Sequence, residues 1–198
     1  MPSFFSRALL CTCAATVSLG AAVAAAPATS AAPVAPAAPA PTVASEQARS
    51  MDVLRAFDKL CNAPALSFDM LAERARITGM KPVPVTGTAP AGTRIGRWGG
   101  TLPSGEFALL VDENRSIKGL MTSCAVAAEV GDADIFRAAA TATMKLRTDV
   151  KSDTGTDGGR LFDFGIVRAP STRITIRDFK PKGLNRVLIS VSTLKPVR

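Results

Sequence analysis

The sequence of 198 residues contains no histidine and no tyrosine, and it has a single tryptophan. Without histidine the chain has no imidazole to activate a serine or cysteine nucleophile, and none to bind zinc or iron. The remaining general acids and bases are carboxylates and lysines, which nearly every protein has. We therefore expect no catalytic residues, no metal site and no cofactor.

Long uncharged apolar runs are also absent beyond the first residues. Arg7 closes a short basic start, residues 8–23 carry no charge, and Ala22-Val23-Ala24 supplies the small residues that a signal peptidase needs. This pattern predicts that residues 1–24 are a signal peptide. An uncleaved membrane anchor is the alternative, because residues 8–26 form a run of 19 residues that is just long enough to span a bilayer. The run is mostly alanine with little leucine, which favours cleavage.

Charge is missing from the next segment as well. Residues 25–45 are alanine, proline, threonine, serine and valine, a composition that buries no core and favours a disordered linker. Charged and apolar residues mix from Glu46 onward, so residues 46–198 are expected to form a single globular domain.

Cysteine is scarce in the mature chain. Cys11 and Cys13 belong to the predicted signal peptide, which leaves Cys61 and Cys124. Exported compartments oxidise thiols, so one disulfide between these two residues is the natural expectation. Two buried free thiols are the alternative, because cysteine is among the residues most often buried.

Helical spacing of apolar residues predicts three helices. The first runs from Glu46 to near Asn62 and turns Phe57 and Cys61 inward. The second starts after Ser67, a good N-cap, and ends at Gly79. The third begins after Asp132 and is rich in alanine, which permits close approach to a sheet.

The strands are expected between and after these helices. A strand over residues 93–98 is broken at Gly99-Gly100, and Pro103-Ser104-Gly105 turns the chain into a central hairpin with its own turn at residues 112–115. Residues 151–159 form a polar loop, and strands follow at 160–167, 172–176 and 186–191. The fold class predicted is α+β, with an antiparallel sheet of five to seven strands and two or three helices mainly on one face.

Several of these features occur together in a known pattern. Phe57-x-x-x-Cys61 on a helix, the glycine-rich segment around Trp98, and Gly119 followed by Cys124-x-Val126 and an alanine-rich helix resemble a family of small exported proteobacterial proteins of uncharacterised function. The resemblance covers about residues 50–150. It implies export and a shared two-cysteine core, and it implies no activity.

Positive charge is concentrated at the end of the chain, where residues 160–198 hold nine basic residues and only two acidic ones. Alternation along 172–177 places isoleucines on one face of a strand and arginines on the other. If this strand pairs with the next, the basic groups gather in a candidate anion-binding site, consisting of Arg173, Arg177, Lys180, Lys182 and Arg186. A solvated face with charges that protect a sheet edge is the alternative.

These observations predict an exported protein, periplasmic or secreted, that acts as a non-catalytic envelope binding or accessory protein. Its partner would be anionic, such as a lipid head group, lipopolysaccharide or polysaccharide, and not nucleic acid. Two alternatives stay open. One is a periplasmic hydrolase that uses carboxylates around Glu106, Asp112 and Glu113, and the other is a purely structural exported domain.

Overall fold

The computed structural model describes residues 42–146, 151–154, 159–166, 172–180 and 183–196. In chain order the elements are three helices and eight strands: α1 (Val43–Cys61), α2 (Phe68–Ile77), β1 (Lys81–Pro82), β2 (Thr93–Leu102), β3 (Gly105–Ser116), β4 (Gly119–Glu129), α3 (Ala133–Met144), β5 (Lys151–Thr154), β6 (Arg160–Ile166), β7 (Thr172–Phe179) and β8 (Arg186–Pro196).

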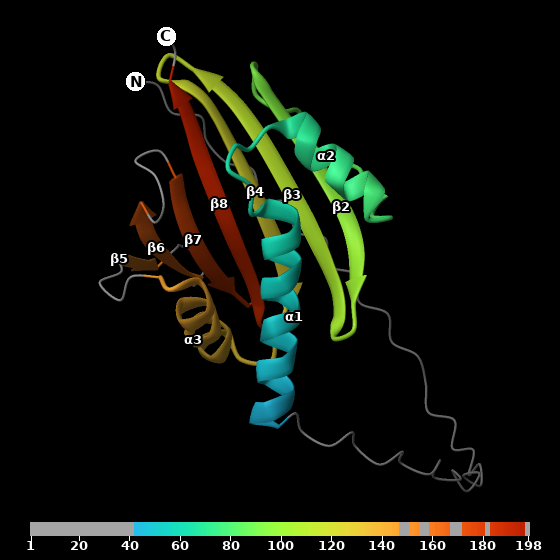
Figure 1. The fold of residues 1–198 in the computed structure, drawn as a ribbon, viewed down its shortest axis with the longest axis vertical. Coiled ribbons are helices and arrows are strands. Elements are labelled where there is room, and N and C mark those ends of the chain that lie inside the picture. Colours follow the sequence, from blue (N-terminus) through green and yellow to red (C-terminus); the bar gives the residue numbers. More distant parts are fainter. Residues whose placement is uncertain (1–41, 147–150, 155–158, 167–171, 181–182, 197–198) are drawn as a thin grey trace, which may run out of the picture. The chain divides into compact units, whose positions relative to one another are not determined.

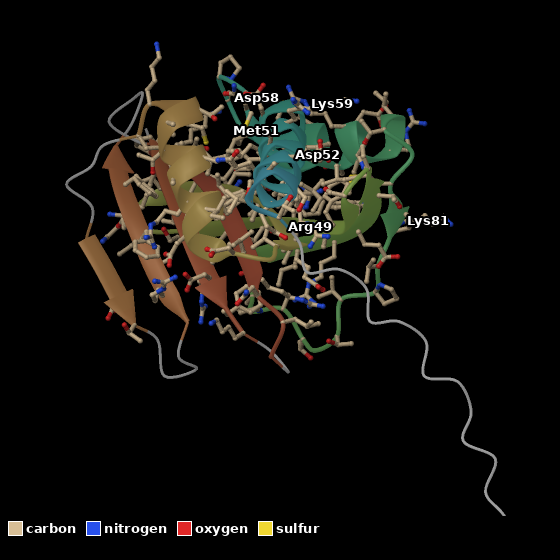
Figure 2. All side chains as sticks on the ribbon, turned by 90° about the horizontal axis from the view of Figure 1, so that it is seen from below. Arg49, Met51, Asp52, Asp58, Lys59 and Lys81 are labelled. Atoms are coloured by element: carbon tan, nitrogen blue, oxygen red, sulfur yellow. A yellow bond between two sulfur atoms is a disulfide. The ribbon has the colours of Figure 1, made fainter. Side chains whose placement is uncertain are left out.

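The strands form one antiparallel sheet in the order β1-β2-β3-β4-β8-β7-β6-β5 (Figure 1). The three helices lie on the same face of this sheet, which is clear when the molecule is seen along the sheet in Figure 2. The predicted α+β class, the antiparallel sheet and the one-sided helix layer are confirmed. The described sheet has eight strands, one more than the upper end of the predicted range.

The core lies between the sheet and the helices. Along each central strand, alternate side chains point to the helices, and cross-strand neighbours such as Leu109, Val126 and Ile189 stand in one row. These three side chains are fully buried. The buried face of α1 carries Phe57 and Leu60, and α3 contributes Phe136, which is 0% exposed. Apolar burial of this kind is the main source of stability.

Three sequence predictions about the strands are wrong. β2 does not break at Gly99-Gly100 but continues to Leu102. β3 does not turn at residues 112–115 but extends to Ser116, and a two-residue turn of Ile117-Lys118 leads into β4. Part of the predicted loop at 151–159 is strand β5. In each case pairing with a neighbouring strand outweighs local polarity or glycine content, because strand formation depends on tertiary context.

The predicted helix ends are confirmed except at the start of α1. The Ser67 hydroxyl accepts the Met70 amide at the start of α2, and Gly79 follows the C-cap with φ of 72°. Asp132 caps α3 by accepting the amides of Asp134 and Ile135. Such side chains satisfy N–H groups that have no partner inside the helix. α1 begins at Val43, three residues before the predicted start, after an N-cap at Thr42.

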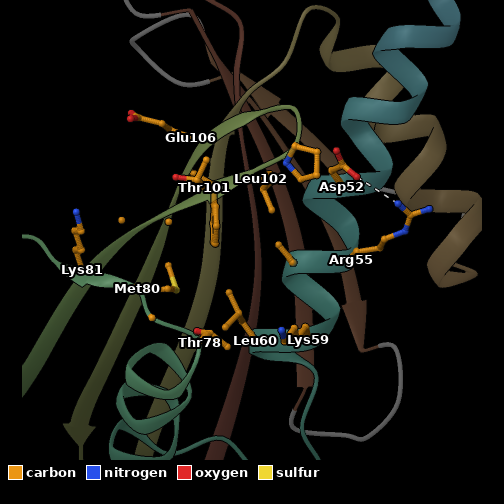
Figure 3. Close-up of a pocket in the computed structure, with 16 residues that line it drawn as sticks. Asp52, Arg55, Lys59, Leu60, Thr78, Met80, Lys81, Thr101, Leu102 and Glu106 are labelled. Carbon is orange, nitrogen blue, oxygen red and sulfur yellow. Dashed lines mark hydrogen bonds and ion pairs between the residues drawn. The ribbon is translucent and has the colours of Figure 1, made fainter.

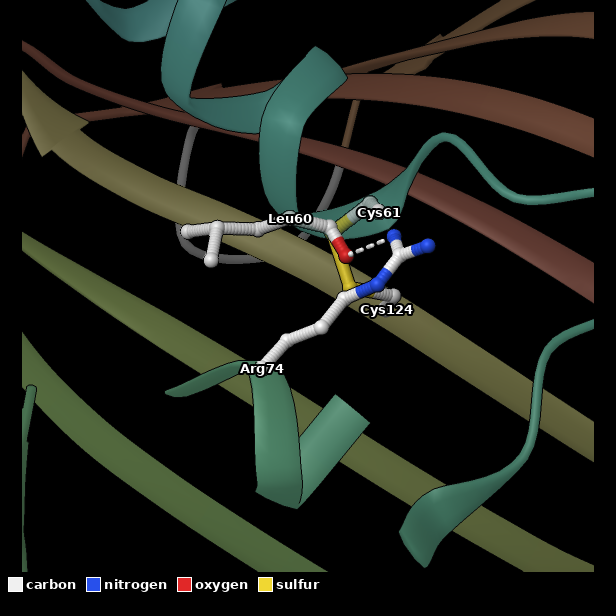
Figure 4. The surroundings of a disulfide bond; sticks show 4 residues. All are labelled: Leu60, Cys61, Arg74 and Cys124. Carbon is white, nitrogen blue, oxygen red and sulfur yellow. Dashed lines mark hydrogen bonds between the residues drawn. A yellow bond between two sulfur atoms is a disulfide. The ribbon is translucent and has the colours of Figure 1, made fainter. Parts of the chain in front are cut away.

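Each end of α1 is tied to β4 or to the loop that follows it. At the N-terminal end the buried Glu46 carboxylate accepts the Gly131 amide at 2.7 Å. At the C-terminal end Cys61 is joined to Cys124 of β4 in a disulfide, with Cα atoms 5.5 Å apart (Figure 4). The predicted pairing of these cysteines is confirmed. The helix is therefore held across the sheet at two points 15 residues apart in the chain.

We expect Glu46→Ala to lower the free energy of unfolding by about 1–3 kcal/mol, because it leaves the Gly131 amide without its acceptor in a half-buried place. Glu46→Gln should cost less, since its amide oxygen can still accept that N–H. Urea unfolding followed by the fluorescence of Trp98 measures both. Equal losses for the two variants would contradict a role for the hydrogen bond.

None of the helices among the described residues is both long enough and apolar enough to cross a membrane.

Candidate functional site

A groove of about 800 Å³ lies on the helix side of the sheet in the described part of the chain (Figure 3). It lies where α1 leaves the first strands of the sheet uncovered. One wall is α1, the other is the segment from Thr78 to Lys81, and the floor is the β2–β3 hairpin. Its volume lies within the range of roughly 300–1,000 Å³ that is typical of ligand pockets.

The floor and lower walls of the groove are apolar. Leu60 and Met80 are 3% and 8% exposed, and Leu102 and Phe107 are half-buried. Gly100 makes room for this surface, because a Cβ at that position would lie 2.5 Å from the Phe107 ring and 3.2 Å from the Met80 methyl. The glycine that sequence analysis took for a strand break therefore lets an aromatic ring lie flat across the neighbouring strand.

The rim of the groove is charged. Asp52 and Arg55 form an ion pair of 3.3 Å along α1. Lys59 lines the groove from the end of α1, Lys81 lines it from β1 on the opposite side, and Glu106 lies at the hairpin (Figure 3). With the Asp52–Arg55 pair neutral, Lys59 and Lys81 make the rim positive, because Glu106 shares the strand face of Asp112 and its side chain points away from the groove. An apolar floor below a weakly basic rim suits a molecule with an apolar body and an acidic end.

The α1 wall of the groove is fixed by two contacts that cluster at its C-terminal end. The disulfide holds Cys61 to the sheet, and the Arg74 side chain of α2 donates to the Leu60 carbonyl at 3.0 Å (Figure 4). That carbonyl belongs to the last turn of α1, where carbonyl groups have no helical partner. The wall is thus held by covalent and polar contacts outside the groove itself.

α2 is anchored by a charged cluster around Arg94 of β2. Its guanidinium donates to Asp69 at 2.6 Å, lies 3.5 Å from Glu113 and stacks 4.1 Å above the Phe68 ring. The hydrogen bond from Arg94, and then its positive charge, lower the pKa of Asp69, and the same contact raises the pKa of Arg94. The cluster positions the helix that precedes the Thr78–Lys81 wall.

The three carboxylates of the hydrolase alternative do not meet. Glu113 accepts the Phe68 amide at 3.2 Å and the Thr122 hydroxyl at 3.3 Å, so it anchors the start of α2. Asp112, its neighbour in β3, points to the opposite face of the sheet. Glu106 lines the groove at the far end of the same strand. Among the described residues there is also no group of three or more side chains able to hold a metal ion.

Three of the predicted anion-binding residues lie on the other face of the sheet. β7 and β8 pair as expected, and Arg173, Arg177 and Arg186 share the face that no described helix covers. Arg173 is 3.5 Å from the Asp163 carboxylate, and Arg186 lies opposite Glu129 in the register of β4 and β8. The basic residues are therefore interleaved with acidic ones.

The other members of the predicted set are placed less centrally. Lys180 is exposed just beyond the end of β7, and Lys182 lies outside the described residues. Arg186 also lines a second hollow of about 510 Å³ at the end of the sheet, together with Glu106, Glu129 and Phe179.

Sequence analysis missed the groove because its lining comes from four separate segments. Met80, Leu102 and Phe107 show no common spacing, and each has an ordinary place in its own local pattern. One signal was present. Two adjacent glycines inside a strand mark a place where another group comes close to the backbone.

Comparison of the chain with protein-family models, with curated proteins and with solved structures gave no match. The resemblance to small exported proteobacterial proteins therefore stays a prediction from the sequence motif. The function has to be argued from the site alone.

Proposed function

We propose that this chain is an exported, non-catalytic binding protein of the cell envelope, and that the groove between α1 and the β2–β3 hairpin holds a single-chain amphiphile with an anionic head. The observation that carries the proposal is the groove itself, with an apolar floor under a rim that includes Lys59 and Lys81. The signal-like residues 1–24 and the disulfide support export.

The floor of the groove supports a ligand with an apolar body. Leu102 and Phe107 are only half-buried, so a chain lying on them removes apolar surface from water on both partners. The anionic head is argued from the rim, where Arg55 is already paired with Asp52 while Lys59 and Lys81 have no ion-pair partner among the described residues. The partner belongs to the anionic class expected from the sequence, but its site is on the helix side of the sheet.

Calorimetry with three probes tests this proposal. Dodecanoate has both chain and charge, dodecanol has the chain alone, and acetate has the charge alone. We expect dodecanoate to bind at least 10-fold more tightly than either of the others. Lys59→Glu combined with Lys81→Glu should weaken dodecanoate binding roughly 10-fold, because each exposed charge contact contributes up to about 1 kcal/mol.

Two further variants complete the design. Leu102→Glu places a carboxylate on the apolar floor and should abolish dodecanoate binding. Lys118→Glu makes the same charge change as either single lysine substitution, half that of the double variant, but lies in the β3–β4 turn, outside the groove, and should leave binding unchanged. Failure of dodecanoate to bind would overturn the proposal. Equal affinities for dodecanoate and dodecanol would show that the groove does not recognise an anionic head.

A further inference from the structure

The face of the sheet opposite the helices is an extended surface, here named the open face. It consists of the outward side chains of β2, β3, β4, β8, β7 and β6, and no described helix covers it (Figure 2). Three large apolar side chains on it are exposed, namely Ile95 at 36%, Met121 at 42% and Leu161 at 38%. Leu110 and Leu188 are half-buried between them.

The strand registers fix how the open face is laid out. In one row across the sheet, Asp112 of β3 is followed by Ser123, Ser192 and then Arg173 of β7. In the next row, Arg97 of β2 is followed by Leu110, Ala125, Ser190, Thr175 and then Asp163 of β6. In the last row, Glu129 of β4 stands beside Arg186 of β8. Opposite charges thus lie at mirrored distances from the β4–β8 boundary.

That boundary is the midline of the sheet, with four strands on either side. A two-fold axis along it, parallel to the strands, would bring β3 of one copy over β7 of another, β4 over β8 and β2 over β6. Asp112 would then face Arg173 of the second copy, and Glu129 would face Arg186. Arg97 would face Asp163 in the same way, and each contact would occur twice by symmetry.

The other face-to-face arrangement lacks this match. A two-fold axis across the strands keeps each strand over itself and exchanges the rows. The position of this axis along the strands decides which side chains meet. One position brings Arg173 over Arg177 and another brings Asp112 over Glu106, so each places like charges together. Complementary charge therefore selects one of the two arrangements.

The centre of the open face is also shaped for close approach. The rows near the midline carry small side chains that would let two sheets meet without steric conflict, while leucines supply apolar contact. The central six strands at about 4.8 Å spacing and four rows of side chains cover on the order of 600 Å², near the roughly 800 Å² per partner of a standard interface. The small residues are Ala108, Ala125, Ala127, Ser123, Ser190 and Ser192.

We propose that the open face binds a second copy of this chain, and that the dimer has a two-fold axis along the β4–β8 boundary with Asp112 of each copy against Arg173 of the other. Asp112 has no ion-pair partner among the described residues of its own chain, while Arg173 reaches Asp163 at 3.5 Å. The surface is on the opposite side of the sheet from the groove, so the dimer does not depend on the proposed ligand.

Sedimentation equilibrium of the protein expressed as the full chain measures this association. We expect a dimer at micromolar concentration that weakens as salt rises. Asp112→Lys should raise the dissociation constant about 100-fold, because one substitution turns two attractive contacts into two repulsive ones. Arg173→Asp should do the same, and the double variant D112K/R173D should restore association, because the exchanged charges again oppose each other.

Lys118→Asp is the matched control, since it makes the same charge change as Arg173→Asp in a turn outside the open face, and it should leave the dimer intact. A monomer at every concentration would overturn the proposal. So would a double variant that stays as weak as the single ones, since rescue depends on the two residues facing each other. Binding of the monomeric chain to vesicles of anionic lipid, lost in Arg173→Asp, would assign the open face to a membrane surface and also overturn it.

Discussion

Removing the disulfide should lower the free energy of unfolding by about 4 kcal/mol. The bond closes a loop with a sequence separation of 63, and on the chain-entropy model a loop of this length stabilises by roughly that amount by restricting the unfolded chain. Most domains have a stability of only about 5–15 kcal/mol, so the loss is a large share of the total. Urea unfolding of the double variant Cys61→Ala with Cys124→Ala gives the value.

A second sample separates the cross-link from the side chains. The unaltered protein in the presence of a reductant keeps both sulfur atoms in the core but loses the bond. The reduced protein should show most of the decrease in the free energy of unfolding that the double variant shows. The difference between the two samples measures the cost of the small cavities left by alanine. An unchanged urea midpoint after verified reduction would contradict a stabilising role for the bond.

Substituting Gly119, the buried first residue of β4, should produce a loss of similar size. Gly119 has φ of 138°, and a Cβ added there would lie 2.2 Å from the Lys195 carbonyl oxygen and 2.9 Å from the Pro196 Cα. Both atoms belong to backbone of β8, so relief requires moving a strand and not a side chain. We expect Gly119→Ala to cost about 4 kcal/mol, from backbone strain and overpacking together.

Gly105 provides the matched control for this prediction. It also begins a strand after a two-residue turn and also has φ of 138°, but an added Cβ would meet nothing within 4 Å. Gly105→Ala therefore carries the backbone strain alone and should cost about 1–3 kcal/mol. Thermal and urea unfolding compare the two variants. Equal losses of stability in the two variants would mean that the end of β8 moves away from the added Cβ without a cost in free energy.

The helices and the cysteine pair were predictable because their signals are local or few. Ser67 and Asp132 cap helices through residues two or three positions away, which a sequence displays directly. With a signal peptide removed, Cys61 had one possible partner. The polar end of β3 was not predictable in this way, because residues 112–116 become strand only by pairing with β2 on one side and β4 on the other.

The candidate site was less accessible to sequence reasoning. Glu113 belonged to the hydrolase alternative, yet its carboxylate accepts an amide 45 positions away at the start of α2. Arg173, Arg177 and Arg186 do share a face as predicted, but the acidic residues among them come from β3, β4 and β6. Charge summed along a chain does not show how charges are interleaved across a sheet.

The order of the strands has a consequence for the sequence of events in folding. β1 to β4 form one meander and β5 to β8 another, and among the described strands the two meanders pair only through β4 and β8. β8 is the last of these strands to be synthesised, yet it lies in the middle of the sheet. Until it arrives, the inner edge of β4 has unpaired backbone groups that can recruit other strands. A chain delivered unfolded across a membrane would thus form the β4–β8 pairing at the centre of its sheet last. A chaperone that shields β4 would protect the chain at the stage when it is most prone to aggregate.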